Sequence, residues 1–150
     1  MPILIPNYIN IKKFDDKATI PTKAHKTDAG YDLYACLDNN VYFSANTVEM
    51  IPTGVGFEIP VGFFGAVYPR SGLATKQGLR LANCVGVIDC GYINQVYVPL
   101  INDSNGIRVV KNGDRIAQII FQPYIDVGLN EVSELAETDR GLNGFGSSGT

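Results

Sequence analysis

Short runs of β-branched and aromatic residues recur along the whole chain, and each run ends at a glycine, a proline or a polar turn residue. Side chains of these types pack well on the surface of a pleated sheet. Pro52, Pro60 and Pro69 fall between runs, where they interrupt any sustained helical period. The pattern predicts strands at residues 8–12, 31–35, 41–43, 48–51, 54–59, 64–68, 95–101, 107–110 and 115–122.

Many short strands at regular spacing are typical of an all-β sandwich or barrel. The best helix candidate is a single turn after Pro69, over residues 71–76. Strands do not alternate with long amphipathic helices, which argues against a doubly wound nucleotide-binding fold. With 150 residues the chain is expected to form one domain, 1–150. From about Glu131 it becomes acidic and then rich in glycine, which predicts a flexible arm over about residues 137–150.

The composition is that of an ordinary globular protein, with 45% hydrophobic and 18% charged residues. No apolar run approaches the roughly 18 residues that a membrane span needs, and residues 1–6 lack the features of a signal peptide. A net charge of −3, without a stripe of Lys and Arg, argues against a nucleic-acid partner. We therefore expect a cytoplasmic protein with no membrane or nucleic-acid partner, in the host cytoplasm if the source is a phage or virus.

Cys36, Cys84 and Cys90 are an odd number of cysteines without a CxxC spacing, and His25 is the single histidine. This pattern supports neither a disulfide framework nor a zinc site. No GxxxxGK[ST] sequence is present, which excludes a Walker-type phosphate cradle. The GxGxxG spacing near the C-terminus is not read as a dinucleotide fingerprint, because that fingerprint needs a preceding strand and a following helix.

The last eleven residues combine glycines and hydroxyl side chains with one arginine and one phenylalanine. Glycines let backbone N–H groups approach an anion closely, and Arg140 can bind a phosphate through two parallel hydrogen bonds. Phe145 offers a flat face for a base. The segment is therefore predicted to be a flexible arm that closes over a phosphate-bearing ligand, and a frayed terminus is the alternative.

Four other clusters of glycine and polar residues precede this tail, at residues 29–33, 69–74, 86–92 and 113–118. They read AGYDL, PRSGLA, GVIDCGY and GDRIAQ. With the tail, they resemble the five ordered motifs of the trimeric dUTPase family, over residues 29–150. The resemblance implies a jelly-roll-like β-clip fold and a homotrimer whose active sites take residues from more than one chain. It also implies hydrolysis of dUTP to dUMP and pyrophosphate, which limits uracil in DNA and supplies dUMP for thymidylate synthesis.

Asp89 is the main candidate for the chemistry. A carboxylate on a rigid turn can orient a water molecule and accept its proton during attack on a phosphoryl group. An aspartate beside glycine more often bonds its own backbone, so the residues alone leave both interpretations open. The resemblance places Asp89 at the general-base position, where it would activate water for attack on the α-phosphate.

The resemblance also implies a nucleoside site. Asn83 corresponds to a side chain that reads the uracil edge, and backbone groups of Val87, Ile88 and Asp89 complete this recognition without room for a 5-methyl group. Tyr92 corresponds to a tyrosine that lies against the deoxyribose and excludes a 2′-hydroxyl. Tyr97 occupies a further contact position, where many family members have lysine.

The phosphate contacts implied by the resemblance come from the second and fourth motifs. Arg70, Ser71 and Gly72 form a loop that leads into the expected helical turn. Its N–H groups and a hydroxyl can donate hydrogen bonds to phosphate oxygens. Gln118 matches a glutamine that contacts the α-phosphate. As ordinary structure, the loop would be a common proline turn and Gln118 an outward-facing strand residue.

A triphosphate carries about four negative charges, so a Mg²⁺ ion bound to the phosphates is expected. Asp32 matches a carboxylate near the metal-bound waters, which makes its contact with Mg²⁺ indirect; as ordinary structure it would be a solvent-exposed residue on a strand edge. Arg140 would act as an arginine finger on the γ-phosphate and Phe145 would cover the uracil ring. Gly146, Ser147 and Ser148 complete the substrate contacts of the tail.

The chain departs from the family pattern after Tyr92, where Ile93, Asn94 and Gln95 replace a step with glycine. Asparagine is the most tolerant replacement for glycine at positive φ, so the hairpin is expected to survive this change. The tail reads Gly-Ser-Ser-Gly instead of Gly-Ser-Thr-Gly, which keeps the hydroxyl.

Two other functions share this pattern. The dCTP deaminases have the same fold, but their catalytic glutamate corresponds to Pro99, and residues 83–102 contain no glutamate. A regulatory protein that keeps the nucleotide pocket and signals through it, as some phage members of the family do, is the other alternative. Its sign would be a lost catalytic residue or an inserted surface element, and the sequence shows neither.

Overall fold

The computed structural model describes residues 6–139 and 141–142. It contains eleven strands and one short helix within these residues, so the all-β prediction is confirmed. The elements are β1 Asn10–Lys13, β2 Tyr31–Tyr34, β3 Val41–Phe43, β4 Val48–Pro52, β5 Val55–Glu58, β6 Phe63–Tyr68, α1 Ser71–Gln77, β7 Leu79–Leu81, β8 Gly86–Ile88, β9 Tyr97–Asn102, β10 Arg108–Val110 and β11 Arg115–Pro123.

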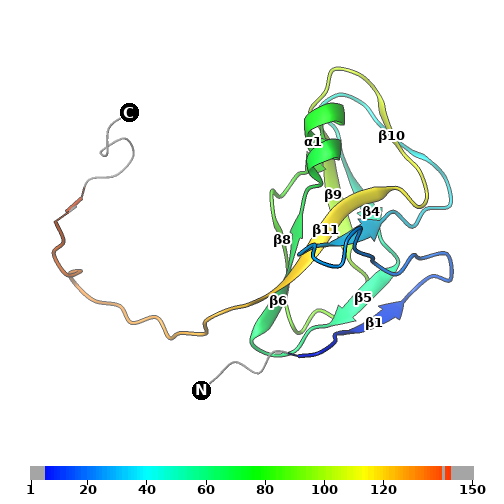
Figure 1. The fold of residues 1–150 in the computed structure, drawn as a ribbon. Helices are drawn as coiled ribbons and strands as arrows, with labels where there is room; N and C mark the ends of the chain where they lie inside the picture. The colour runs from blue at the N-terminus through cyan, green and yellow to red at the C-terminus, as the bar shows by residue number, and fades with distance from the viewer. Residues whose placement is uncertain (1–5, 140, 143–150) are drawn as a thin grey trace.

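The strands pair in antiparallel fashion in four groups (Figure 1). The largest sheet has the order β2-β11-β6-β8, and a second sheet has the order β4-β9-β7. The pairs β1-β5 and β10-β3 complete the body. Most neighbours in these sheets are distant in sequence, so segments far apart along the chain are brought side by side.

A single hydrophobic cluster draws on strands of all four groups. Leu33, Phe43, Ile51 and Leu100 are completely buried in it. Burying a side chain of this size contributes about 1.5–3 kcal/mol each. Cys36 also lies in this cluster, and burial raises the pKa of its thiol, so it remains a protonated apolar group.

The predicted strands are all present within one or two residues of their expected ends, but β7 and β8 were not predicted. Each has three residues, too few for a period of two to be visible, and β8 begins at a glycine. β8 exists because it pairs with β6, with Val87 opposite Ala66. α1 continues to Gln77, one residue beyond the prediction, and ends at Gly78, whose φ of 70° suits a glycine.

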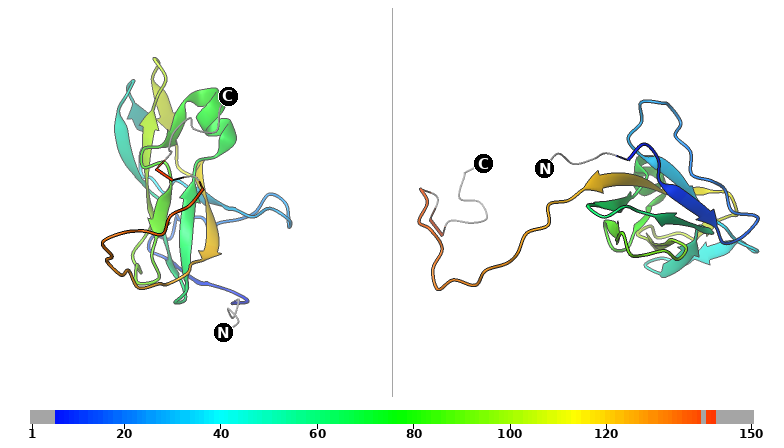
Figure 2. Two further views of the ribbon diagram at one scale, coloured as in Figure 1. Left: turned by 90° about the vertical axis from the view of Figure 1, so that its left-hand side faces the viewer. Right: turned by 90° about the horizontal axis from the view of Figure 1, so that it is seen from below.

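The chain leaves the body of the protein after β11, ahead of the acidic stretch near Glu131 (Figures 1 and 2). Tyr124 is still attached through its N–H to the Gly62 carbonyl, at 3.0 Å. Beyond it, apolar side chains such as Leu129 (98% exposed) and Leu135 (88% exposed) contact little of the body. No helix in the described part of the chain is long and apolar enough to cross a membrane.

Candidate active site

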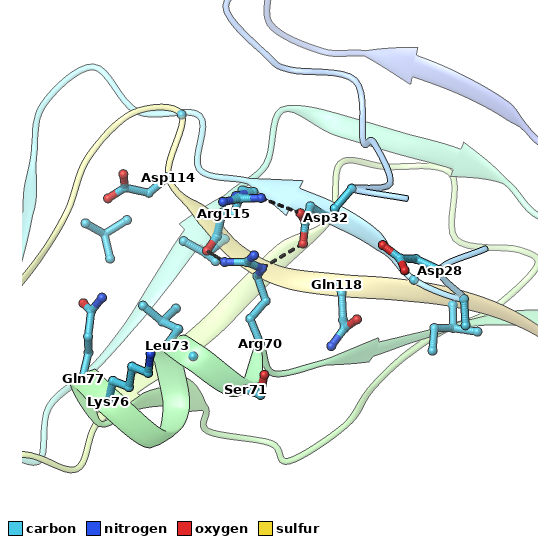
Figure 3. A pocket seen from close by; sticks show the side chains of 18 of the residues that line it. Asp28, Asp32, Arg70, Ser71, Leu73, Lys76, Gln77, Asp114, Arg115 and Gln118 are labelled. Atoms are coloured by element: carbon cyan, nitrogen blue, oxygen red, sulfur yellow. Dashed lines mark hydrogen bonds and ion pairs between the residues drawn. The ribbon is translucent and has the colours of Figure 1, made fainter. Parts of the chain in front are cut away.

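A polar cavity of about 810 Å³ opens where α1, the start of β11 and the loop before β2 meet (Figure 3). Both signs of charge contribute to its wall. Its polar side chains are Asp28, Asp32, Arg70, Ser71, Lys76, Gln77, Asp114, Arg115 and Gln118. The cavity therefore collects the predicted residues of the first, second and fourth sequence motifs, Gly72 included.

Asp32 lies between two arginines in this cavity (Figure 3). Arg70 donates from Nε to Oδ1 at 2.8 Å, and Arg115 donates from Nη1 to Oδ2 at 3.3 Å. The Asp32 side chain is 14% exposed, so it is not a solvent-exposed residue on a strand edge, which was the ordinary structural interpretation of the sequence. Because one carboxylate holds both guanidinium groups, their remaining N–H donors are fixed relative to each other.

Arg115 is a site residue that sequence reasoning missed, although it lies inside the GDRIAQ cluster. A register shift between Arg115 and Ala117 interrupts the pairing of β11 with β2. This β-bulge lets Ile116 and Ala117 both enter the core, at 1% and 0% exposure, and leaves Arg115 facing the cavity. The sequence signal was available as two consecutive apolar residues after a polar one at the start of a strand.

Arg70 also begins the helical turn. It is the N-cap residue of α1, with extended backbone angles (φ −87°, ψ 127°). The first backbone N–H groups of an α-helix have no partner within the helix, so those near Ser71 and Gly72 can donate hydrogen bonds to the oxygens of an anion. Gln118 is attached to the same loop, since its Nε2 donates to the Pro69 carbonyl at 3.0 Å.

The predicted nucleoside residues do not line this cavity. They lie on and around β8, an outer strand of the four-stranded sheet, in a segment that we call the β8 turn (residues 83–92). Asn83 and Asp89 are exposed on either side of β8, and Val87 is 60% exposed between them. Ile88 is half-buried and Tyr92 is 39% exposed. The single chain thus separates the predicted site into two parts.

Hydrogen bonds to backbone carbonyls make the β8 turn compact. The Tyr92 N–H donates to the Asp89 carbonyl at 3.0 Å, and the Tyr92 hydroxyl donates to the Gln95 carbonyl at 2.8 Å. Val85 donates to the Asn83 carbonyl at 2.7 Å. The Asp89 carboxylate accepts no hydrogen bond from any residue in 6–139 or 141–142, in contrast to the alternative in which it bonds its own backbone.

The bend at Asn94 forms without a positive φ at this residue. Among the described non-glycine residues, positive φ occurs at Asn46 and Cys84, so Asn94 does not adopt the left-handed conformation. Its Oδ1 accepts a hydrogen bond from the Gln95 N–H at 2.7 Å, and the Gln95 side chain in turn bonds Gly54. Side-chain hydrogen bonds shape this bend, so a glycine is not required there.

Tyr97 lies at the start of β9, outside the polar cavity, and is linked to Tyr92 of the β8 turn through Gln95. It is 41% exposed, and its hydroxyl accepts a hydrogen bond from the Gln95 Nε2 at 2.8 Å. The predicted tail residues Arg140, Phe145, Gly146, Ser147 and Ser148 lie outside the described residues.

Comparisons with known proteins agree on one family. The dUTPase family model matches residues 16–149. Proteins named deoxyuridine 5′-triphosphate nucleotidohydrolase are similar to the chain: one from Wolbachia pipientis is 44% identical, covering 94% of this chain and 95% of its own. One from Syntrophotalea carbinolica is 42% identical, covering 94% and 96%.

Solved structures give the same result. A mutant dUTPase of phage 80alpha matches with a TM-score of 0.87 at 28% identity, covering 96% of this chain and all of the other. A second mutant of that Staphylococcus phage enzyme, solved with dUpNHpp, matches with a TM-score of 0.83 at 28% identity, covering 97% and 100%. The family match over most of the sequence, the relatives above 40% identity and the shared fold lead to one conclusion: the chain belongs to the dUTPase family.

Proposed function

We propose that this protein hydrolyses dUTP to dUMP and pyrophosphate as a homotrimer, with Asp89 activating water for attack on the α-phosphate. The observation that carries the proposal is the division of the predicted site: the residues predicted to bind phosphate line the polar cavity, while those predicted to bind the nucleoside lie on the β8 turn. A site completed by a second chain accounts for this division. Its relatives are named for the same reaction.

The charges of the polar cavity support a ligand that brings its own counter-ion. Arg70, Lys76 and Arg115 are balanced by Asp28, Asp32 and Asp114, so the described wall has little net charge. A triphosphate with about four negative charges needs further cations. Arg140 and a Mg²⁺ ion bound to the nucleotide would supply them.

The residues present fit an indirect metal contact. No group of three or more His, Cys, Asp or Glu that could hold a metal ion occurs within residues 6–139 and 141–142. Asp32 accepts one hydrogen bond on each oxygen, and a carboxylate oxygen has two lone pairs, so each can still accept a bond from a metal-bound water. When bound, Mg²⁺ would neutralise phosphate charge.

The exposed edge of β8 supports uracil recognition. β8 pairs with β6 on one side, and no described strand pairs with its other side. Backbone N–H and C=O groups at such an edge can bond the donor and acceptors of a uracil, and the Asn83 amide adds one of each. The compact turn that holds Tyr92 supports its role against the sugar, where it would exclude a 2′-hydroxyl.

An apolar surface on the second sheet supports the homotrimer. We call it the outer sheet face: Val48, Met50, Tyr97 and Ile101, on the side of β4 and β9 away from the core. Val48 is 49% exposed and Met50 is 57% exposed. Adjacent exposed apolar residues of this kind are typical of an interface between subunits.

Replacing Met50 by arginine is expected to break the trimer into monomers, because the interface would bury an unpaired charge. Light scattering coupled to gel filtration measures the mass. Val61→Arg is the matched control, since Val61 is 86% exposed but lies between β5 and β6, away from the outer sheet face. A Met50→Arg protein that keeps the mass of three chains would exclude this face from the interface.

The reaction is tested by pyrophosphate release with Mg²⁺ from dUTP, dTTP, UTP and dCTP in parallel. We expect turnover of dUTP alone, because the methyl group, the 2′-hydroxyl and the exocyclic amine are each rejected by a different part of the β8 turn. Deamination of dCTP would favour the deaminase alternative. Against it, the position that corresponds to the deaminases' catalytic glutamate is Pro99, in the middle of β9 opposite Met50, and a proline cannot act as a base.

An enzyme of this kind acts on the pool of free nucleotides, so we propose a cytoplasmic location, or the host cytoplasm for a phage or viral protein. If all four nucleotides remain intact with a folded trimer, the regulatory-binder alternative gains support. Displacement of a bound protein partner by dUTP would then be its positive test.

A further inference from the structure

Gly30 lies at the edge of the polar cavity, immediately before β2. Its φ is not positive, unlike that of Gly54, Gly62 or Gly78, so the backbone there does not require a glycine. The limited space beside Gly30 does require a glycine. A Cβ atom at position 30 would lie 2.6 Å from Gln118 Oε1, 3.3 Å from Gln118 Cβ and 3.4 Å from Gln118 Cδ. The nearest obstacle to a side chain at Gly30 is therefore Gln118 alone.

Gln118 is held from the opposite direction by the loop that carries Arg70. It lies on β11, directly opposite Asp32 on β2 and Tyr68 on β6. Its Nε2 donates to the Pro69 carbonyl at 3.0 Å. The side-chain amide thus has Nε2 on Pro69 and Oε1 in the space that a side chain of residue 30 would occupy.

We propose that Gly30 is a positioning residue for the phosphate site, acting through Gln118. A primary amide has two N–H donors, so with one on Pro69 the second remains for an oxygen of the ligand. Because Gly30 has no side chain, the Gln118 amide can keep this orientation. The amide lies between the loop before β2 and the Pro69–Arg70 loop, and so couples the positions of the two loops. The inference rests on the proposed function, since the bound ligand it serves is a nucleotide phosphate.

The Gly30→Ala variant separates this role from a structural one. The obstructing Oε1 is the end of a flexible side chain and can rotate away, and the 3.3 Å contact with Gln118 Cβ needs a shift of only a few tenths of an ångström. The fold is therefore expected to persist with a melting temperature close to the native one. Displacing the amide breaks its bond to Pro69 and misplaces the phosphate contact. A misplacement of about 1 Å can cost about 10²-fold in rate, so we expect kcat/KM for dUTP to fall on the order of 10²-fold. Gly106→Ala is the matched control, because its Cβ would meet Arg108 Nη1 at an ordinary 3.5 Å.

A double-mutant cycle tests whether Gly30 acts through Gln118. Gln118→Ala removes Oε1 and Cδ, so for a methyl group at position 30 only the contact with Cβ at 3.3 Å remains, which a shift of a few tenths of an ångström relieves. We expect the double variant to be as active as Gln118→Ala alone, within about twofold. Penalties that multiply would show that Gly30 acts independently of Gln118 and would overturn the proposal.

A crystal structure of Gly30→Ala without nucleotide gives a readout that does not depend on turnover. We expect the distance from Gln118 Nε2 to the Pro69 carbonyl, 3.0 Å in the native chain, to exceed 3.5 Å. If the amide stays in place, the proposal is wrong even when dUTP is hydrolysed normally. If the amide moves but the native protein does not hydrolyse dUTP, the proposed reaction fails and the positioning role of Gly30 stands.

Discussion

Asp89→Asn is expected to lower kcat for dUTP by about 10³-fold or more while binding of a non-hydrolysable dUTP analogue changes little. General-base catalysis contributes about 10²–10⁴-fold, and an amide cannot accept the proton of the attacking water. Asparagine keeps the shape of the side chain. The turn itself depends on the Asp89 carbonyl, which accepts the Tyr92 N–H at 3.0 Å, and this bond survives the substitution.

The measurement combines steady-state turnover with calorimetric titration of the analogue. Asp16→Asn is a matched control, because Asp16 is an exposed aspartate outside the polar cavity and the β8 turn. A kcat within about threefold of the native value would remove Asp89 from the chemistry. Loss of analogue binding together with turnover would instead show that Asp89 holds the nucleotide.

The strands could be predicted because their signal is local. β9 and β11 have six and nine residues, are rich in Val, Ile, Tyr or Phe and are bounded by turn residues, which is enough to fix both type and position. β8 has three residues, and its existence depends on pairing with β6, about twenty residues away in the sequence. Such a strand follows from tertiary contacts, which no local pattern records.

The same distinction applies to the site. Asp89 and Tyr92 could be proposed because motif residues lie close together in sequence, and the structure holds them in one turn. The contact of Asp32 with Arg70 and Arg115 joins three distant segments, and its geometry depends on the bulge in β11. Sequence reasoning therefore assigned Asp32 to solvent or to metal-bound waters, and did not see that its first partners are two guanidinium groups.

The bend at Asn94 shows a related limit. The sequence argument for its survival was that asparagine is the most tolerant substitute for glycine at positive φ. In the structure, the Asn94 side chain bonds the next residue, and this bend has no positive φ at Asn94. A glycine position thus predicts a conformation only while the surrounding side chains are also kept.

Removing residues 140–150 is expected to lower kcat for dUTP by about 10³-fold or more, while the trimer and its melting temperature are retained. An arginine that stabilises the transition state of phosphoryl transfer is worth about 10³–10⁵-fold, and the deletion removes Arg140 and Phe145 together. Within the described residues, the fold does not depend on this C-terminal segment. The hydrophobic core lies within residues 18–119, and residues 124–139 are exposed throughout.

Two full-length variants divide this effect between its sources. Arg140→Lys keeps the charge but loses the planar pair of donors, so most of the loss in kcat should remain. Phe145→Ala should raise KM more than it lowers kcat, because stacking on the base acts in the ground state as well as in the transition state. Near-native turnover by the truncated protein would exclude the tail from catalysis. Loss of the trimer on truncation would show that the tail holds the subunits together, and the catalytic role would then rest on Arg140→Lys alone.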